Sequence, residues 1–316
     1  MSTDITIIIP TYQGFSWLGE TLPALRQQKY SGQVTILAVD SGSTDGTVDL
    51  LKQFGAKVIS ITQAQFSHGY ARNLAVKNAA TPLVVFMSQD VLPVGTDWLE
   101  KLVALLDDPA VGAAHVRQLP RPGATPLETF FQQELYPPKN KRLTWKPGER
   151  MTLSKMFFSN VCSVARRELC LRFPFPEDII MSEDQAFARS LLQAGYQIIY
   201  SGDITVFHSH HYSLETLFRR NFDSAYSLRG IAADTPVSIA LAGVSYIARE
   251  TAFLVRNGHW LWLFYMPVYE ATRTLGRLCG SQADRMSYDL RVKLSLHRRF
   301  WSISRDRSSS PSPESL

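Results

Sequence analysis

Short runs of apolar, often β-branched residues alternate with amphipathic stretches through the first hundred residues of the chain. The apolar runs are nearly continuous, which is typical of strands buried on both faces of a parallel sheet that helices cover. We therefore predict strands at Ile5–Pro10, Thr35–Asp40, Lys57–Ile61 and Val84–Ser88, and helices at Trp17–Gln28, Thr47–Phe54, Tyr70–Asn78 and Trp98–Leu106.

Polar residues follow each predicted strand directly. Open α/β sheets bind ligands at the carboxyl ends of their strands, so these residues are expected to converge on one polar crevice. They are Thr11–Tyr12, Asp40–Ser43, Phe66–Gly69 and Gln89–Asp90.

The alternation breaks at residues 118–155, which are rich in Pro, Arg and Lys, and we interpret this segment as an insertion. Order resumes with a strand at Asn160–Arg166, a helix at Glu183–Ala194 and a strand at Gln197–Tyr200, closing at Val206–His208. Beyond Ser213 the pattern is helical. We expect one α/β domain over residues 1–215, a helical, basic and aromatic extension over 216–303, and a disordered tail over 304–316.

Composition adds three constraints. The net charge of +5 arises in the last hundred residues, which hold 14 of the 33 Lys and Arg but only 8 of the 28 Asp and Glu. The three cysteines lack the spacing of a zinc site or a disulfide framework, which fits a reducing cytoplasm. The start of the chain does not resemble a secretion signal. The apolar stretch Val237–Val268 is interrupted by charged residues and is not expected to span a membrane.

Six motifs in order, IIIPTYQG, VDSGSTDGT, FSHGYARNLA, FMSQDVLP, MSEDQAFARSLLQAGYQI and VFHSHHYS, resemble the inverting family 2 glycosyltransferases over about residues 5–215. Within that family the set is most similar to bacterial rhamnosyltransferases. The resemblance implies a GT-A fold, a Rossmann-like nucleotide-binding mixed sheet flanked by helices, here with a helical C-terminal extension. It also implies that a sugar is moved from a nucleotide-sugar donor, and that the insertion faces the acceptor.

The resemblance assigns the donor nucleotide to the ends of the early strands. Asp40 can accept hydrogen bonds from a ribose or base, while the nearby Asp45 and Thr47 are equally explained as a helix start. Gly69 opens a helix whose first turn, with Arg72 and Asn73, favours an anion such as a diphosphate. The full expected set is Pro10, Thr11, Tyr12, Asp40, Ser41, Gly42, Ser43, His68, Gly69, Arg72, Asn73 and Gln89.

Ser88-Gln89-Asp90 occupies the place of the family's DxD motif, which presents carboxylates to Mg²⁺ or Mn²⁺. Only Asp90 is acidic here, so the site needs a further ligand. The resemblance implies His208, with His210 and His211 less favoured, and imidazole suits Mn²⁺ better than Mg²⁺.

Glu183 and Asp184 begin a predicted helix behind Ser182, a plausible N-cap, and capping is one explanation of these acids. The other is catalytic, because inverting transfer needs a base that removes the acceptor's hydroxyl proton. By resemblance Asp184 is that base, and Glu183 holds the acceptor or the helix start. Asn160 and Trp145 are expected acceptor contacts.

The C-terminal third combines apolar runs with arginines. Such a composition fits both an anionic membrane interface and packing against the catalytic domain or a second subunit. The resemblance favours a cytoplasmic enzyme, peripheral at the inner face of the plasma membrane, with a saccharide or lipid-linked acceptor. The basic residues are interleaved with apolar runs, so nucleic acid is not an expected partner.

The expected donor is dTDP-L-rhamnose, with UDP-hexoses as the alternative. Two other functions are alternatives to a glycosyltransferase. A nucleotidyltransferase would need a basic glycine-rich loop after the first strand, where the chain has Pro10 to Gly14. A non-catalytic sugar-nucleotide-binding or scaffold protein would fit the incomplete DxD but not the retained acids Glu183 and Asp184.

Overall fold

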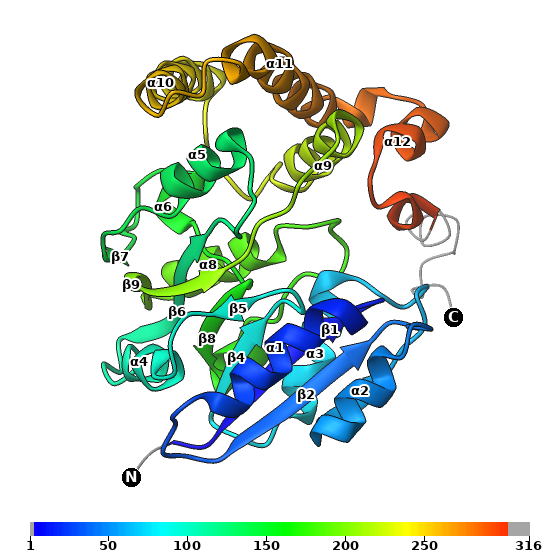
Figure 1. The fold of residues 1–316 in the computed structure, drawn as a ribbon, viewed down its shortest axis with the longest axis vertical. Coiled ribbons are helices and arrows are strands. Elements are labelled where there is room, and N and C mark those ends of the chain that lie inside the picture. The colour runs from blue at the N-terminus through cyan, green and yellow to red at the C-terminus, as the bar shows by residue number, and fades with distance from the viewer. Residues whose placement is uncertain (1–2, 303–316) are drawn as a thin grey trace.

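The computed structural model describes residues 3–302 (Figure 1). In this range nine strands form one sheet: β1 Ile5–Thr11, β2 Val34–Asp40, β3 Lys57–Ser60, β4 Leu83–Met87, β5 Leu92–Pro93, β6 Val111–Leu119, β7 Lys141–Leu143, β8 Cys162–Arg166 and β9 Gln197–Phe207. Their order is β3-β2-β1-β4-β8-β6-β9-β5, and β7 pairs with β9 outside this path.

The sheet is mixed. Strands β3, β2, β1 and β4 run parallel, β8 is antiparallel to both of its neighbours β4 and β6, and β6 is parallel to β9. The carboxyl ends of β1, β2 and β4 therefore meet at one edge, where the sequence places its polar residues.

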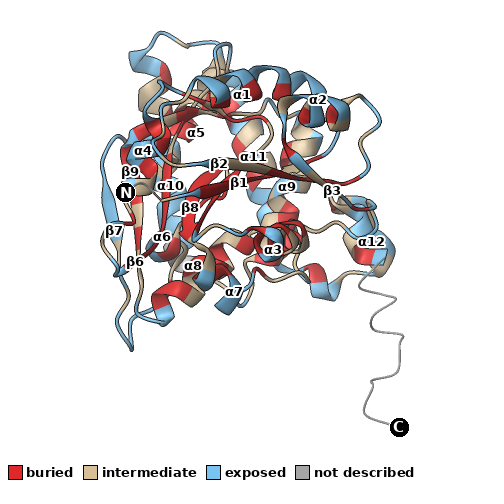
Figure 2. Ribbon diagram, turned by 90° about the horizontal axis from the view of Figure 1, so that it is seen from below, coloured by how far each residue is buried: buried red, intermediate tan, exposed pale blue. Residues whose placement is uncertain are grey.

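Helices cover both faces of the sheet (Figure 2). One face carries α1 Phe15–Gln27, α2 Thr47–Phe54 and α4 Trp98–Ala104, and the other carries α3 His68–Asn78, α7 Arg167–Arg172 and α8 Glu183–Gln193. Side chains alternate along β1 accordingly: Ile7 and Ile9 pack with Leu22 of α1, whereas Ile8 packs with Ala75 of α3. The apolar runs are continuous because both faces are buried.

Sequence patterns missed several elements after α4. The two late strand segments form the single strand β9, and the nine-residue strand β6 was not predicted. The expected insertion contains α5 Pro126–Leu135, β7 and α6 Leu153–Met156. Helix α5 begins at a capping box in which Thr125 Oγ1 accepts from the Glu128 N–H and the Glu128 carboxylate accepts from the Thr125 N–H.

Beyond the sheet the chain is helical: α9 Leu214–Ser227, α10 Pro236–Arg256, α11 Trp262–Ser281, the 3₁₀ turn η1 Ala283–Arg285 and α12 Tyr288–Leu294. Helices α9, α10 and α11 lie together at the top of Figure 1. Among the described helices, none has the length and apolar character needed to cross a membrane. The predicted tail, residues 304–316, lies outside the described residues.

Two glycines allow α11 to lie close against α9. A Cβ added at Gly276 would come within 2.5 Å of the Phe218 carbonyl oxygen, and one at Gly280 within 2.1 Å of the Phe222 carbonyl oxygen. Four-residue spacing on both helices aligns these two contacts. The packing of the helical extension therefore depends on small residues at 276 and 280.

We predict that Gly280→Ala lowers the free energy of unfolding by about 1–3 kcal/mol, because the helices must separate to admit the methyl group. Gly243→Ala on α10 is the matched control, since an added Cβ there meets nothing within 4 Å. The control should be neutral or slightly stabilising, because Ala favours helix. Urea denaturation followed by circular dichroism measures both, and equal midpoints for the two variants would contradict this packing.

Candidate active site

Asp40 at the end of β2 holds its own loop together. Its Oδ2 accepts from the N–H groups of Gly42 (3.0 Å) and Ser43 (2.9 Å), and its Oδ1 accepts from the hydroxyls of Thr11 (3.1 Å) and Ser43 (2.5 Å). The Ser41 hydroxyl donates to the Thr11 carbonyl. Gly42 has φ = +89°, a conformation that glycine adopts without strain. Asp40 is 2% exposed, so its first role is to shape this turn.

Gln89 joins the ends of β1 and β4. Its Oε1 accepts from the Tyr12 N–H at 2.9 Å and its Nε2 donates to the Tyr12 carbonyl at 3.0 Å. A carboxylate can accept but cannot donate, so an acidic residue at position 89 would lose half of this pairing. This pairing accounts for the amide at position 89, the middle position of the motif, and does not bear on Ser88, where the motif departs from DxD. The neighbouring Pro10 is in register with Val39 of β2.

Asp90, His208 and His210 offer one ligand atom each within 4.8 Å of one another. Asp90 Oδ2 lies 3.6 Å from His208 Nε2 and 3.3 Å from His210 Nε2, and the two Nε2 atoms are 3.1 Å apart. One carboxylate and two imidazoles suit a divalent transition metal. The structure therefore adds His210, which the sequence ranked below His208, to the candidate metal ligands.

Gln118 fixes the orientation of His208. Gln118 Nε2 donates to the Tyr136 hydroxyl (2.7 Å) and to Ser159 Oγ (3.0 Å), so its Oε1 is left to accept from His208 Nδ1 at 2.8 Å. A protonated Nδ1 leaves the Nε2 lone pair for a metal. Burial lowers the pKa of His208 to about 4, against the opposing effect of Asp90, so the imidazole is neutral at pH 7.

The first turn of α3 packs tightly against the chain before α8. Ser67 caps the helix by accepting from the Tyr70 N–H. A Cβ at Gly69 would lie 2.0 Å from the Pro176 carbonyl oxygen, so this position requires glycine. Asn73 bonds the Phe175 backbone through both its carbonyl and its amide. These residues fix α3 against the chain that leads into α8. Both the carbonyl and the amide of the Asn73 side chain are used in these hydrogen bonds.

Arg72 forms an ion pair with Glu183, with its Nη1 2.8 Å from Oε1 and both side chains 7% exposed. The pair connects α3 to the first residue of α8. Arg72 was expected to meet a diphosphate, but in this structure its charge is opposed by Glu183. Glu183 therefore pairs with Arg72 in addition to placing a negative charge at the start of α8.

Asp184 follows at the edge of the same site. Its Oδ2 accepts from the Asn160 N–H at 3.3 Å, and its Oδ1 from the Gln185 N–H at 2.9 Å. Burial, and next the negative charge of Glu183, raise the pKa of Asp184 to about 7, while Arg72 acts in the opposite direction. Ser182 stands at the N-cap position but makes no capping bond, and its φ of +69° is strained for a residue other than glycine.

The two expected acceptor contacts differ in position. Asn160 is 1% exposed, and its side-chain Nδ2 has no hydrogen-bond partner among the described residues. Trp145 instead packs against the apolar cluster beneath α3 and α8, and its Nε1 donates to the Glu149 carbonyl. Within residues 3–302, no hydrogen bond or ion pair joins Trp145 to Asp184 or Asn160.

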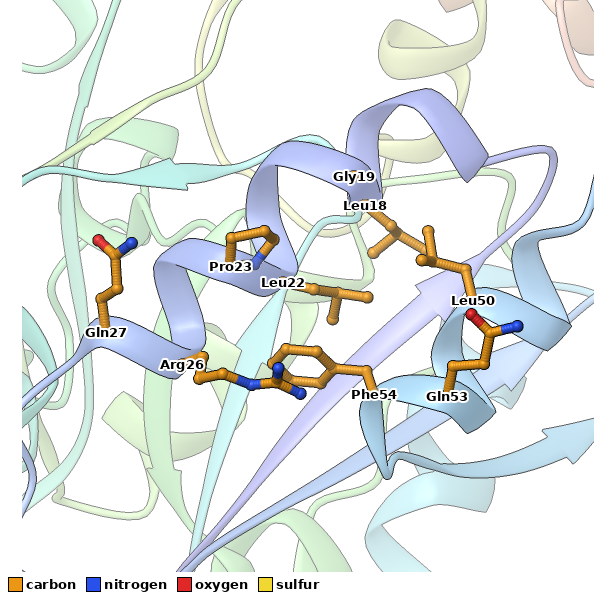
Figure 3. Close-up of a pocket in the computed structure, with 9 residues that line it drawn as sticks. All are labelled: Leu18, Gly19, Leu22, Pro23, Arg26, Gln27, Leu50, Gln53 and Phe54. Atoms are coloured by element: carbon orange, nitrogen blue, oxygen red, sulfur yellow. The ribbon is translucent and has the colours of Figure 1, made fainter.

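A cavity of about 820 Å³ lies among the residues that follow β1 and β2, the start of α3 and residues 177–180. Three residues of the set predicted to bind the donor line it, namely Tyr12, Ser41 and His68, and so does the C-terminal stretch 296–300, which sequence patterns did not place here. A second, smaller groove of about 330 Å³ lies between α1 and α2 (Figure 3). Its charged side chain, Arg26, stacks on Phe54, and no acid or histidine lines the groove.

A mixed sheet flanked by helices, with polar residues and an Asp/His cluster at its strand ends, is the architecture of an α/β enzyme that binds its substrate at the carboxyl ends of its strands. Residues 6–170 match the family described as Glycosyl transferase family 2, and the chain belongs to that family. It is a glycosyltransferase.

Two curated relatives extend the likeness over nearly the whole chain. The O-antigen chain rhamnosyltransferase RfbN of Salmonella typhimurium is 29% identical over 94% of this chain and 96% of its own. The O-antigen chain rhamnosyltransferase WbaN of Salmonella anatum is 27% identical over 94% of this chain and 95% of its own. These matches confirm the resemblance to bacterial rhamnosyltransferases.

Solved structures confirm the GT-A fold. The mannosyltransferase PcManGT from Pyrobaculum calidifontis, in complex with GDP-Man and Mn²⁺, superposes with a TM-score of 0.62 at 20% identity, over 90% of this chain and 89% of its own. TarS 1-349 of S. aureus in complex with UDP gives a TM-score of 0.53 at 18% identity, over 98% and 93%.

We predict that Asp90→Asn and His208→Ala each weaken Mn²⁺ binding by roughly tenfold or more, because each removes one of the three converging ligand atoms. His211→Ala is the control, since the His211 side chain is 77% exposed and faces Glu128. Isothermal titration of the purified protein with Mn²⁺ measures the affinities. Equal affinities for the wild type and the two ligand variants would rule out this metal site.

Proposed function

We propose that the protein transfers a sugar in one inverting step from a nucleoside diphosphate to a hydroxyl of a saccharide or lipid-linked saccharide. The observation that supports the proposal is a series of hydrogen bonds through two adjacent residues. It connects Asp184 to the cluster of Asp90, His208 and His210. Residues 159 and 160 are adjacent in sequence, and Ser159 bonds Gln118, which orients His208, while Asn160 bonds Asp184.

Asp184 acts as the general base. A carboxylate whose pKa burial raises to about 7 is a stronger base than an exposed aspartate, yet it is still ionised in about half of the molecules at that pH. It accepts the acceptor's proton while the acceptor oxygen attacks the anomeric carbon opposite the diphosphate. Glu183, neutralised by Arg72, keeps Asp184 at the helix start.

Asp90, His208 and His210 would hold a divalent cation, for which we propose Mn²⁺ or Mg²⁺. When bound, such an ion stabilises the negative charge that develops on the departing diphosphate. The loop ordered by Asp40, together with Tyr12, contacts the nucleoside. Tyr12 is 45% exposed and lines the cavity, so its ring is free to pack beside a base.

We propose that the donor is dTDP-L-rhamnose, that the transferred sugar is L-rhamnose, and that the product is a surface polysaccharide. This proposal is supported by the two relatives that match along nearly their whole length, since both are described as O-antigen chain rhamnosyltransferases. A UDP-hexose is the alternative, because the solved structures of similar fold bind other donors, UDP-GlcNAc and GDP-Man among them.

The decisive experiment offers the purified protein dTDP-rhamnose, UDP-glucose, UDP-galactose or UDP-N-acetylglucosamine with an acceptor extract and Mn²⁺. We expect one donor to release its nucleoside diphosphate. Asp184→Asn should lower kcat by at least about a hundredfold while donor binding persists, because only the base is removed. Asp49→Asn, at an exposed carboxylate of α2, is the matched control. A chain that neither turns over nor binds any of these donors would instead be a scaffold protein.

The pH dependence of kcat/KM tests independently whether Asp184 is the general base. Since Asp184 must lose its proton to act, kcat/KM should rise tenfold per pH unit below about pH 7 and level off above it. The acid limb should vanish from the residual activity of Asp184→Asn. A wild-type profile that stays flat down to pH 5 would assign the base to another group.

We also propose that the protein docks on anionic membrane surfaces through α10 and α11. These helices and the turn between them, which contains Trp260 and Leu261, expose the following apolar side chains: Leu241, Val244, Trp260, Leu261, Phe264, Val268, Leu275 and Leu278. The acids of these helices, Glu250 and Glu270, are buried, whereas Arg256 is exposed and Arg249 is exposed but pairs with Glu134 of α5. An apolar surface that carries an exposed cation complements an anionic bilayer, where a lipid-linked acceptor would be found.

We predict that the protein floats with vesicles of phosphatidylglycerol and phosphatidylethanolamine, and that the double variant Leu261→Glu/Phe264→Glu does not. The two side chains are each 83% exposed, so charge there opposes insertion without disturbing the core. Leu171→Glu is the control, because Leu171 is an exposed leucine on α7, outside the proposed docking surface. Wild-type protein that stays at the bottom would contradict membrane docking, and a dimer that the double variant separates would assign the surface to a second copy.

A further inference from the structure

The leaving diphosphate needs cations, and the arginine that the sequence singled out is already paired. Arg72 is 6% exposed and forms an ion pair with Glu183. Asp90 and Asp184 add negative charge to the same site. A diphosphate placed here requires positive charges that no buried carboxylate neutralises.

The C-terminal stretch 296–300 supplies one wall of the 820 Å³ cavity. The His297 ring lies edge-on to the His68 ring with centroids 5.7 Å apart, and the Arg299 guanidinium donates to Gln63 Oε1 on the opposite wall. Arg298 also lines the cavity and makes no hydrogen bond or ion pair with the described residues. Residues more than 200 positions apart in sequence thus enclose one space.

This stretch is anchored from α9. The Asp223 carboxylate is 0% exposed, and its Oδ2 accepts from the N–H groups of Leu296 (2.9 Å) and His297 (3.0 Å). Trp301, 2% exposed, packs against Tyr226 of the same helix with ring centroids 4.6 Å apart. The wall is therefore held in place by buried contacts on both sides of Arg298.

Arg220 lies one helical turn before Asp223, on the same side of α9. Its guanidinium lies 5.4 Å from the centre of the Tyr212 ring, and within residues 3–302 it makes no ion pair or hydrogen bond. The Tyr212 ring in turn lies near the His210 ring, with centroids 5.5 Å apart, and Asp223, one turn after Arg220, holds the backbone of Leu296 and His297. Arg220 is thus close to the candidate metal ligands and to the cavity wall.

We propose that Arg220 and Arg298 bind the diphosphate of the nucleotide donor, so that the C-terminal extension completes the donor site. The inference rests on the proposed function. It assigns to the C-terminal extension the positive charges for the diphosphate, because Arg72 is already paired with Glu183. Glu177 and Asp178 also line the cavity, but within residues 3–302 neither guanidinium makes an ion pair, and arginine binds phosphate oxygens through paired N–H donors. Asp223 acts as a positioning residue by holding the backbone that carries Arg298.

The test compares the affinities of the Mn²⁺-loaded protein for dTDP and UDP with those for thymidine and uridine. Arg220→Ala and Arg298→Ala should each weaken diphosphate binding by roughly tenfold or more, because each removes a charge-assisted contact. Nucleoside binding should change by less than about threefold, since the base and ribose keep their contacts. Arg298→Lys should recover part of the diphosphate affinity.

Arg219→Ala is the matched control, because Arg219 neighbours Arg220 on α9 but pairs with Glu215 at 2.7 Å. Wild-type diphosphate affinity in both alanine variants would overturn the assignment, as would an equal loss of nucleoside binding, which indicates a disturbed fold. A wild-type chain that binds none of the nucleotides and turns over no donor would contradict the proposed function itself.

Discussion

Arg72 and Glu183 form an ion pair that is almost entirely removed from water, and it connects the helix that follows the early strands to the helix that begins with Asp184. Removing one partner of such a pair typically costs about 3–5 kcal/mol, because the other charge is left buried and uncompensated. The position of α8 relative to the parallel half of the sheet therefore depends on this contact. The same pair influences Asp184, whose pKa Glu183 raises and Arg72 lowers.

A second group of polar contacts connects the two chemical centres. Gln118 bonds His208, Tyr136 and Ser159, and the next residue, Asn160, donates its N–H to Asp184. Each of these bonds excludes the alternative orientations of its partner, so the imidazole and the carboxylate are held in fixed positions before any ligand arrives. Preorganisation of this kind is what electrostatic catalysis requires.

The parallel half of the fold and the candidate motifs could be read from sequence because their signals are local. Strands β1 to β4 appear as continuous apolar runs, and the polar residues after them reach one edge through the topology alone. The role of Gln89 could not be read, since its partner Tyr12 is 77 positions away. Arg220 was missed for a similar reason: on sequence alone it is one of many arginines in a basic extension, and only Asp223 shows which side of α9 faces the site.

The helical extension is consequently more than an addition to a complete catalytic domain. Helix α9 presents Asp223 and Arg220 toward the site, and its backbone at Phe218 and Phe222 receives Gly276 and Gly280 of α11. A rotation of α9 would move both the cavity wall and the apolar surface of α10 and α11, because close backbone contact leaves no room for the helices to slide independently. In the proposed enzyme, α9 therefore connects the donor site to the helices that we propose contact a membrane.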